Sequence, residues 1–166
     1  MADYHQMWKD LGMDVETHDQ LCEVLPQAFG DVYLSQENRP EGMDYYNFVV
    51  AEIHGVRPAE LIEHQKKGGK VFGTFCVYVP DEIVFAADAI ATGLCGGSQF
   101  WVPGGEKVLP TNTCPLIKAS VGARLDRTCP FFRIADMYVG ETTCDGKKKE
   151  VGGQAVLGRQ LIKATP

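Results

Sequence analysis

The chain has 166 residues, and 45% of them are hydrophobic, which suffices for one globular domain with a buried core. Its net charge of −6 is uneven, because residues 1–69 carry 13 Asp or Glu against 5 Lys or Arg. No basic stripe with interleaved aromatic residues occurs, which argues against a nucleic-acid partner. No leader-like start and no uncharged apolar stretch of about 18 residues is present, so the sequence predicts a cytoplasmic protein that does not bind membranes.

Residues 1–69 are predicted to form a mainly helical N-terminal extension. Apolar side chains recur at helical spacing in two stretches, 21–29 and 46–53. A third helix is expected to have Pro58 near its first turn and to end at Gly68.

The four histidines all lie in this extension, at His5, His18, His54 and His64. Their polar or helical surroundings indicate surface residues or ordinary core residues. Cys22, inside the first expected helix, is interpreted as a small buried apolar side chain.

From Lys70 onward the pattern changes to short elements of alternating type. The sequence predicts strands at 70–76, 99–102 and 134–139 and helices at 80–91 and 115–124. Strands that alternate with helices predict an α/β fold with a parallel sheet, in which ligands bind outside the carboxyl ends of the strands. The expected domain organisation is therefore a helical extension at 1–69, an α/β domain at 70–150 and a divergent tail at 151–166.

Five of the six cysteines fall between residues 73 and 149, where there is no histidine; they are Cys76, Cys95, Cys114, Cys129 and Cys144. Cys114 and Cys129 both occur as Thr-Cys-Pro, so each is expected just before the first residue of a helix. At that position the helix dipole and free backbone N–H groups favour a thiolate. Since disulfides are rare in the cytoplasm, we interpret these cysteines as metal ligands, for an iron–sulfur cluster above all.

Other interpretations of this region remain open. Structural zinc sites usually show closely spaced Cys pairs or Cys with His, and the stretch has neither. A nucleophilic cysteine would need a base from the N-terminal extension or a carboxylate, and reduced cysteines also occur as plain core residues. Glu141 is a candidate for a proton-handling group or a group that supports a ligand, and the run 147–149 of three lysines is interpreted as a solvated charge run.

Three motifs occur in the order of a known family: GTFCVYVPDE at 73–82, LPTNTCPLIK at 109–118 and ETTCDGKKK at 141–149. With them, residues 58–149 resemble the 2-hydroxyacyl-CoA dehydratase D-component family. That family includes benzoyl-CoA reductase subunits and double-cubane cluster proteins.

The resemblance implies a Rossmann-like domain that holds an iron–sulfur cluster, [4Fe–4S] or double-cubane. It implies Cys76, Cys114 and Cys144 as cluster ligands, with Cys129 as a further candidate, while Cys95 and Cys129 together look more like the double-cubane branch. The implied partners are an ATP-dependent iron–sulfur activator protein, a second dehydratase subunit or a homodimer partner, and an acyl-CoA or small-molecule substrate.

Two activities follow from the resemblance. In the dehydratases, one low-potential electron from the activator makes a ketyl radical of a 2-hydroxyacyl-CoA, which loses water. In the double-cubane branch, small molecules are reduced at the expense of ATP.

The sequence departs from the family after residue 149, where family members continue into a second α/β domain. That second domain is expected to be missing here, so that the isolated chain lacks one wall of the cluster cleft. The resulting exposed surface is expected to favour self-association. A non-catalytic domain that binds a cluster or a partner is therefore the third interpretation.

Overall fold

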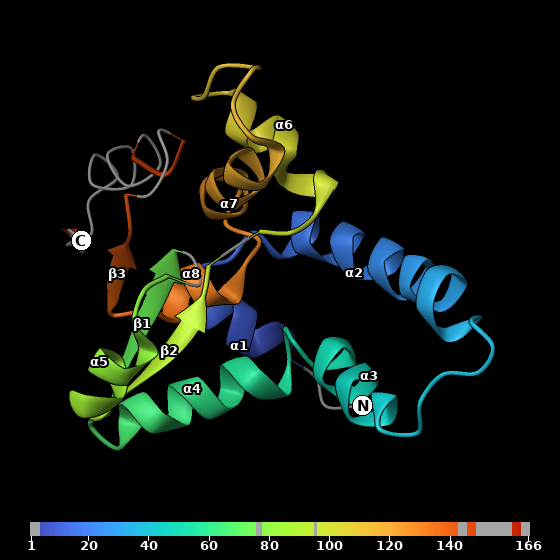
Figure 1. Ribbon diagram of the computed structural model, residues 1–166, viewed down its shortest axis with the longest axis horizontal. Coiled ribbons are helices and arrows are strands. Elements are labelled where there is room, and N and C mark those ends of the chain that lie inside the picture. Colours follow the sequence, from blue (N-terminus) through green and yellow to red (C-terminus); the bar gives the residue numbers. More distant parts are fainter. Residues whose placement is uncertain (1–3, 76–77, 95, 143–145, 149–160, 164–166) are drawn as a thin grey trace.

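The computed structural model describes residues 4–75, 78–94, 96–142, 146–148 and 161–163. Its centre is a parallel sheet with the strand order β2-β1-β3-β4 (Figure 1). The strands are β1 (Lys70–Phe75), β2 (Ala89–Gly93), β3 (Met137–Gly140) and β4 (Leu161–Lys163). The predicted α/β fold with a parallel sheet, flanking helices and a helical N-terminal region is confirmed.

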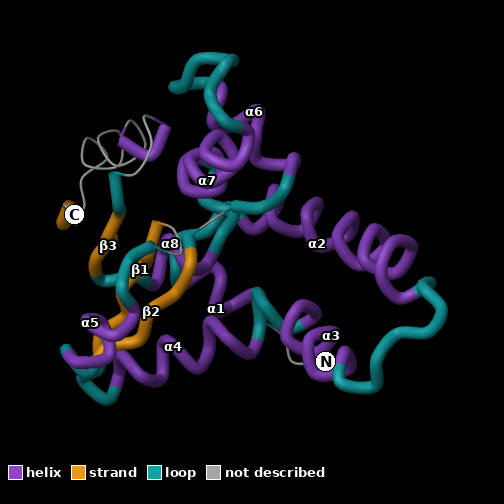
Figure 2. Tube along the Cα trace, in the orientation of Figure 1, coloured by secondary structure: helices purple, strands orange, loops and turns teal. Residues whose placement is uncertain are grey.

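Helices surround the sheet on several sides (Figure 2). The N-terminal region contains α1 (His5–Asp10), α2 (Val15–Phe29), a π-helix (Gly30–Leu34), α3 (Met43–Ala51) and α4 (Val56–Lys66). The later helices are α5 (Asp81–Ala86), a 3-10 helix (Gln99–Trp101), α6 (Val102–Glu106), α7 (Pro115–Leu125) and α8 (Pro130–Ile134).

The central strand β1 runs through the core. Val71 and Phe75 are almost fully buried, and they belong to one apolar cluster with Leu61 of α4, Phe132 of α8 and Tyr138 of β3. The strand runs buried at nearly every position because parallel sheets are covered on both faces. From β1 the chain goes first to β2 on one side and later to β3 on the other side, so the strand order reverses between β1 and β3. Ligands usually bind at such a switch point in parallel α/β sheets.

Two predicted elements are wrong. The helix expected at 80–91 ends at Ala86, because Asp88 adopts a left-handed backbone with φ 53° and Ala89 then begins β2. The strand expected at 99–102 is instead a 3-10 helix that runs into α6, and the Ser98 hydroxyl accepts a hydrogen bond from the Phe100 N–H at its start.

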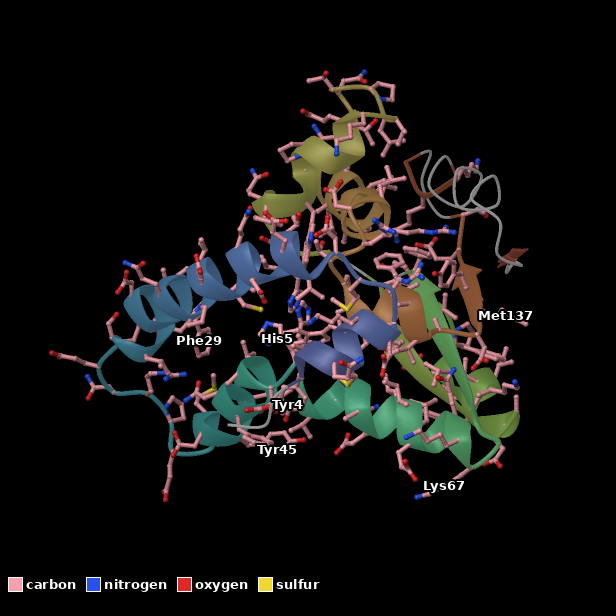
Figure 3. The ribbon with its side chains drawn as sticks, turned by 180° about the vertical axis from the view of Figure 1, so that it is seen from behind. Tyr4, His5, Phe29, Tyr45, Lys67 and Met137 are labelled. Carbon is pink, nitrogen blue, oxygen red and sulfur yellow. The ribbon has the colours of Figure 1, made fainter. Side chains whose placement is uncertain are left out.

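The N-terminal helices are where the periodicity predicts them, but the apolar side chains of α3 and of the second half of α2 are largely exposed. The second half of α2, the π-helix and α3 extend away from the sheet (Figures 1 and 3). Their exposed large apolar side chains are Val24, Leu25, Val32, Tyr33, Leu34, Tyr45, Tyr46, Phe48, Val49, Val50 and Ile53. Helical spacing therefore predicts the positions of these helices but not the burial of their apolar side chains.

Asp136 ties the start of β3 to β1 and α4. Its carboxylate accepts hydrogen bonds from the Val71 N–H at 2.9 Å and from Gln65 Nε2 at 2.8 Å, and Lys70 Nζ lies 3.6 Å away. Partial burial alone would raise the pKa of Asp136, but these two hydrogen bonds and the lysine charge lower it below its ordinary value.

We expect this carboxylate to make the fold acid-sensitive. A lowered folded-state pKa stabilises the protein above the unfolded value of about 3.9, and this stabilisation is lost as the pH falls through the folded-state pKa. In Asp136→Asn the midpoint of urea unfolding should be lower at pH 7 and should fall less between pH 6 and pH 3. Glu41→Gln, at an exposed turn, is the control; equal acid dependence of Asp136→Asn and the parent would contradict the prediction.

Candidate functional site

The carboxyl ends of β1 and β3 meet at the centre of the sheet. Phe75 and Gly140 are Cα partners in the parallel register, and the Glu141 N–H donates a hydrogen bond to the Phe75 carbonyl at 3.2 Å. Phe75 is the residue before Cys76. The pairing therefore joins the start of the segment that carries Cys76 to the start of the segment that carries Cys144.

The side chains that follow the two strands also meet. Glu141 is 5% exposed and forms an ion pair with Lys147, whose side chain is 18% exposed. Lys147 Nζ lies 5.3 Å from the centre of the Tyr78 ring, which places a cation over an aromatic face. The lysine is thus held by two partners, and the solvated charge run that the sequence predicts is wrong for Lys147.

These contacts bracket two of the predicted ligands. In the sequence, Cys76 lies between Phe75 and Tyr78, and Cys144 lies between Glu141 and Lys147. Phe75 contacts Glu141, and Tyr78 contacts Lys147. Cys76 and Cys144 themselves lie outside the described residues. The Glu141–Lys147 ion pair thus joins residues that lie before and after Cys144 in the sequence.

Cys114 begins α7, as its Thr-Cys-Pro sequence predicts. It occupies the N-cap position with Pro115 in the first turn, its side chain makes no capping hydrogen bond, and the residue is exposed. Further along α7, the Ser120 hydroxyl accepts a hydrogen bond from the Gly96 N–H at 3.1 Å, so the helix packs beside the loop that follows β2. Ser120 comes six positions after Cys114, which corresponds to about 9 Å along the helix axis.

Cys129 also lies at a helix start, at the N-cap of α8, but its surroundings differ from the expectation. The residue is 8% exposed and belongs to the apolar core. Burial raises the pKa of its thiol to about 11, although the N–H groups of Phe132 and Phe131 act in the opposite direction. The thiolate predicted at Cys129 is therefore disfavoured, because desolvation outweighs the end of a five-residue helix.

Cys95 lies outside the described residues, although both of its neighbours are placed. The Leu94 N–H donates to the Thr74 carbonyl at 3.0 Å, and Gly96 contacts α7. Leu94 is 1% exposed and packs in the core. The segment around Cys95 thus passes from the sheet to α7, and the ligand role of Cys95 stays a prediction.

A group of side chains that could hold a metal ion was missed by the sequence interpretation. His18, Cys22 and His54 offer one ligand atom each, and these atoms all lie within 4.8 Å of one another. His18 is completely buried, as one of the two expectations for the histidines has it, and Cys22 is half-buried. The spacing of His18 and Cys22, four residues apart in one helix, places both on the same face and was the available signal. His54 could not be added from spacing, because it comes from another element.

In the described part of the chain no helix is long and apolar enough to cross a membrane. The fold defines a class: an α/β domain with a parallel sheet whose strand ends carry cysteine-containing segments. Residues 76–152 match the family described as 2-hydroxyglutaryl-CoA dehydratase, D-component. The resemblance that the sequence predicts is confirmed over this segment.

The chain also resembles a curated protein. It is "Putative dehydratase subunit YjiM" of Escherichia coli (strain K12), and it is 45% identical to this chain over 89 residues. The matched part is 54% of this chain and 23% of the relative. The chain thus spans about a quarter of the length of the curated relative that it matches.

Proposed function

We propose that this chain contributes iron–sulfur cluster ligands to an enzyme of the 2-hydroxyacyl-CoA dehydratase type. The observation that carries the proposal is the contact between the segments around Cys76 and Cys144, within the part of the chain that matches the dehydratase family. Cluster irons need cysteine thiolates brought together in space rather than closely spaced in sequence. Parallel neighbouring strands meet this need, since their carboxyl ends lie at one edge.

The donor set on this chain fits such a cluster. Cys76, Cys114 and Cys144 would hold it, and the exposed Cys114 thiol at the start of α7 is available to an incoming iron. When bound, the cluster supplies a single low-potential electron. The chain's own contribution is to orient the thiols: the Glu141–Lys147 pair joins the residues before and after Cys144, and Cys114 stands at the start of α7.

The proposed reaction of the whole enzyme is the dehydration of a 2-hydroxyacyl-CoA through a ketyl radical of the substrate. It uses one electron from an ATP-dependent iron–sulfur activator, and a second subunit or a second copy of the chain completes the cleft. A cytoplasmic location agrees with this chemistry. Glu141 is proposed as a positioning residue rather than a proton carrier, since Lys147 already occupies its carboxylate.

The double-cubane alternative calls for more sulfur ligands on this chain. Cys129 would be one of them, and its burial in the core with a raised pKa weighs against that role. The dehydratase-type site with Cys76, Cys114 and Cys144 therefore has the better support.

Anaerobic purification and reconstitution of the chain, with iron and acid-labile sulfide analysis and EPR before and after dithionite, test the proposal. We expect iron and sulfide in equal amounts in the parent chain and less than half as much in Cys114→Ala. Because the Cys114 side chain makes no capping hydrogen bond, this change should leave α7 intact. Leu116→Ala, at an exposed position of the same helix, is the matched control and should keep the cluster.

Two outcomes would overturn the proposal. The first is a parent chain that holds no iron and sulfide after reconstitution, which would favour a partner-binding domain without a cluster. The second is a cluster content in Cys114→Ala equal to that of the parent.

A further inference from the structure

Three side chains from two separate parts of the N-terminal region converge where α2 meets the turn between α3 and α4. His18 Nε2 lies 2.8 Å from His54 Nδ1, and Cys22 Sγ lies 3.6 Å from the His18 ring nitrogens. His18 and Cys22 are one turn apart on α2, while His54 is 36 positions from His18 in the sequence. The cluster lies outside the segment 76–152 that matches the dehydratase family.

The distances approach those of a tetrahedral metal site. Zinc bonds of about 2.05 Å to nitrogen and 2.3 Å to sulfur imply about 3.3 Å between two nitrogen ligands and about 3.6 Å between nitrogen and sulfur. Cys22 Sγ lies 3.6 Å from His18 Nε2 but also 3.6 Å from His18 Nδ1, so the cysteine side chain would have to turn toward the Nε2 side of the ring to share an ion with it. The two imidazole nitrogens would have to separate by roughly half an ångström, which a small rotation of the His54 side chain can supply.

The surroundings hold the imidazoles in place as ligands. The Trp8 indole N–H donates to the His54 carbonyl at 2.8 Å, and the Trp8 ring packs 4.2 Å from the His18 ring. His18 is fully buried and His54 partly buried, so both rings are held within the fold.

Charge at this place favours a cation. Asp19 lies next to His18 on α2, and its carboxylate is 3.0 Å from His5 Nε2. Residues 1–69 as a whole carry 13 acidic against 5 basic side chains. A divalent ion bound to one thiolate and two neutral rings would carry a net charge of +1 within this acidic region.

We propose that His18 Nε2, His54 Nδ1 and Cys22 Sγ bind a divalent transition-metal ion, with Zn²⁺ as the ion that this donor set fits best. Imidazole and thiolate together suit zinc, and three protein ligands leave a fourth position for water. The thiol proton is released to solvent when the ion binds. The site would clamp α2 to the turn that precedes α4.

The competing explanation is that the three side chains satisfy one another without a metal. A His–His hydrogen bond needs one ring to donate and the other to accept, and a thiol beside them is a weak additional partner. Direct metal binding by the folded chain separates the two explanations, because the competing one predicts no stoichiometric uptake.

The test is titration of the metal-free, reduced chain with Zn²⁺ and with Co²⁺, in competition with a chromophoric chelator. The parent should bind one equivalent, and Co²⁺ should produce a thiolate-to-metal charge-transfer band. Cys22→Ala and His54→Gln should each weaken binding by about 100-fold or more, since even an outer contact to a metal ligand is worth about 10–100-fold. The charge-transfer band should be absent in Cys22→Ala.

Two control variants keep this result distinct from the proposed cluster. His64→Gln, on α4 and outside the group of three, should bind Co²⁺ as the parent does. Cys114→Ala should also keep the Co²⁺ band while it loses iron and sulfide, and Cys22→Ala should show the reverse. Circular dichroism confirms that each variant is folded.

Two results would overturn the proposed metal site. One is a folded parent chain that takes up no equivalent of Zn²⁺ against the chelator, and the other is Zn²⁺ binding by Cys22→Ala and His54→Gln as tight as that of the parent. A Co²⁺ band that disappears in Cys114→Ala but persists in Cys22→Ala would place the metal at the cluster cysteines and would equally overturn it.

Discussion

Replacing Gly122 by alanine is expected to lower the free energy of unfolding by about 2–3 kcal/mol, the upper part of the range for overpacked cores. A Cβ atom at Gly122 of α7 would lie only 1.8 Å from the Trp101 carbonyl oxygen, and no rotation of a side chain can relieve a clash with backbone. Gly105 of α6 shows the reciprocal contact, with its Cβ 2.1 Å from the Lys118 carbonyl oxygen. The two short helices touch backbone to backbone.

The measurement is thermal unfolding followed by circular dichroism. For a chain of this length the loss corresponds to a decrease in Tm of roughly 4–12 °C. Gly30→Ala is the matched control: nothing lies within 4 Å of its added Cβ, and alanine is the better helix former, so Tm should stay level or rise. A Tm in Gly122→Ala within one degree of the parent would show that α6 and α7 are not packed in this way.

The same change should reach the proposed cluster. Cys114 begins α7, so a methyl group that pushes α7 away from Trp101 also shifts the Cys114 thiol relative to the ends of β1 and β3. We therefore expect reduced iron and sulfide in Gly122→Ala at a temperature where the variant is still folded. Ligand groups displaced by about an ångström bind poorly, because their supporting contacts define their geometry.

The main elements of the fold could be predicted from the sequence because they depend on local signals. The β-branched and aromatic run that begins at Lys70 gave β1, and Pro115 after Cys114 gave the start of α7. The 3-10 helix at Gln99–Trp101 could not be found in this way, because its aromatic residues have high β-propensity. There, the burial of Trp101 and its indole N–H bond to the Thr128 hydroxyl decide the structure, and both depend on distant residues.

The candidate sites show the same division between local and distant information. The position of Cys114 follows from two neighbouring residues, whereas the burial of Cys129 follows from the whole core. Lys147 looked like one of three solvated lysines, and only the fold brings it to Glu141 and Tyr78. His54 joins His18 through the path of the chain around α3, which no spacing rule contains.

Lys147→Met is expected to destabilise the chain more than Gly122→Ala, by about 3–5 kcal/mol, because it removes the positive charge that lies against the nearly buried Glu141 carboxylate. The double variant Glu141→Gln with Lys147→Met removes both charges together, so most of the lost free energy of unfolding should be regained. Lys9→Met, at an exposed position of α1, should change the free energy of unfolding by no more than about 0.5 kcal/mol. Urea unfolding of the four proteins gives the coupling energy directly.

The coupling also bears on function, since Glu141 and Lys147 stand on either side of Cys144 in the sequence. If the ion pair positions the segment that carries Cys144, the double variant should regain stability but not cluster content. Methionine and glutamine fill the space of the pair, but they form no ion pair that would hold the two ends of the segment together. Stability and cluster content that recover together would assign the pair to packing alone. Equal urea midpoints for Lys147→Met and Lys9→Met would contradict the burial of the ion pair. They would also contradict the contact between the two cysteine-containing segments on which the proposed function rests.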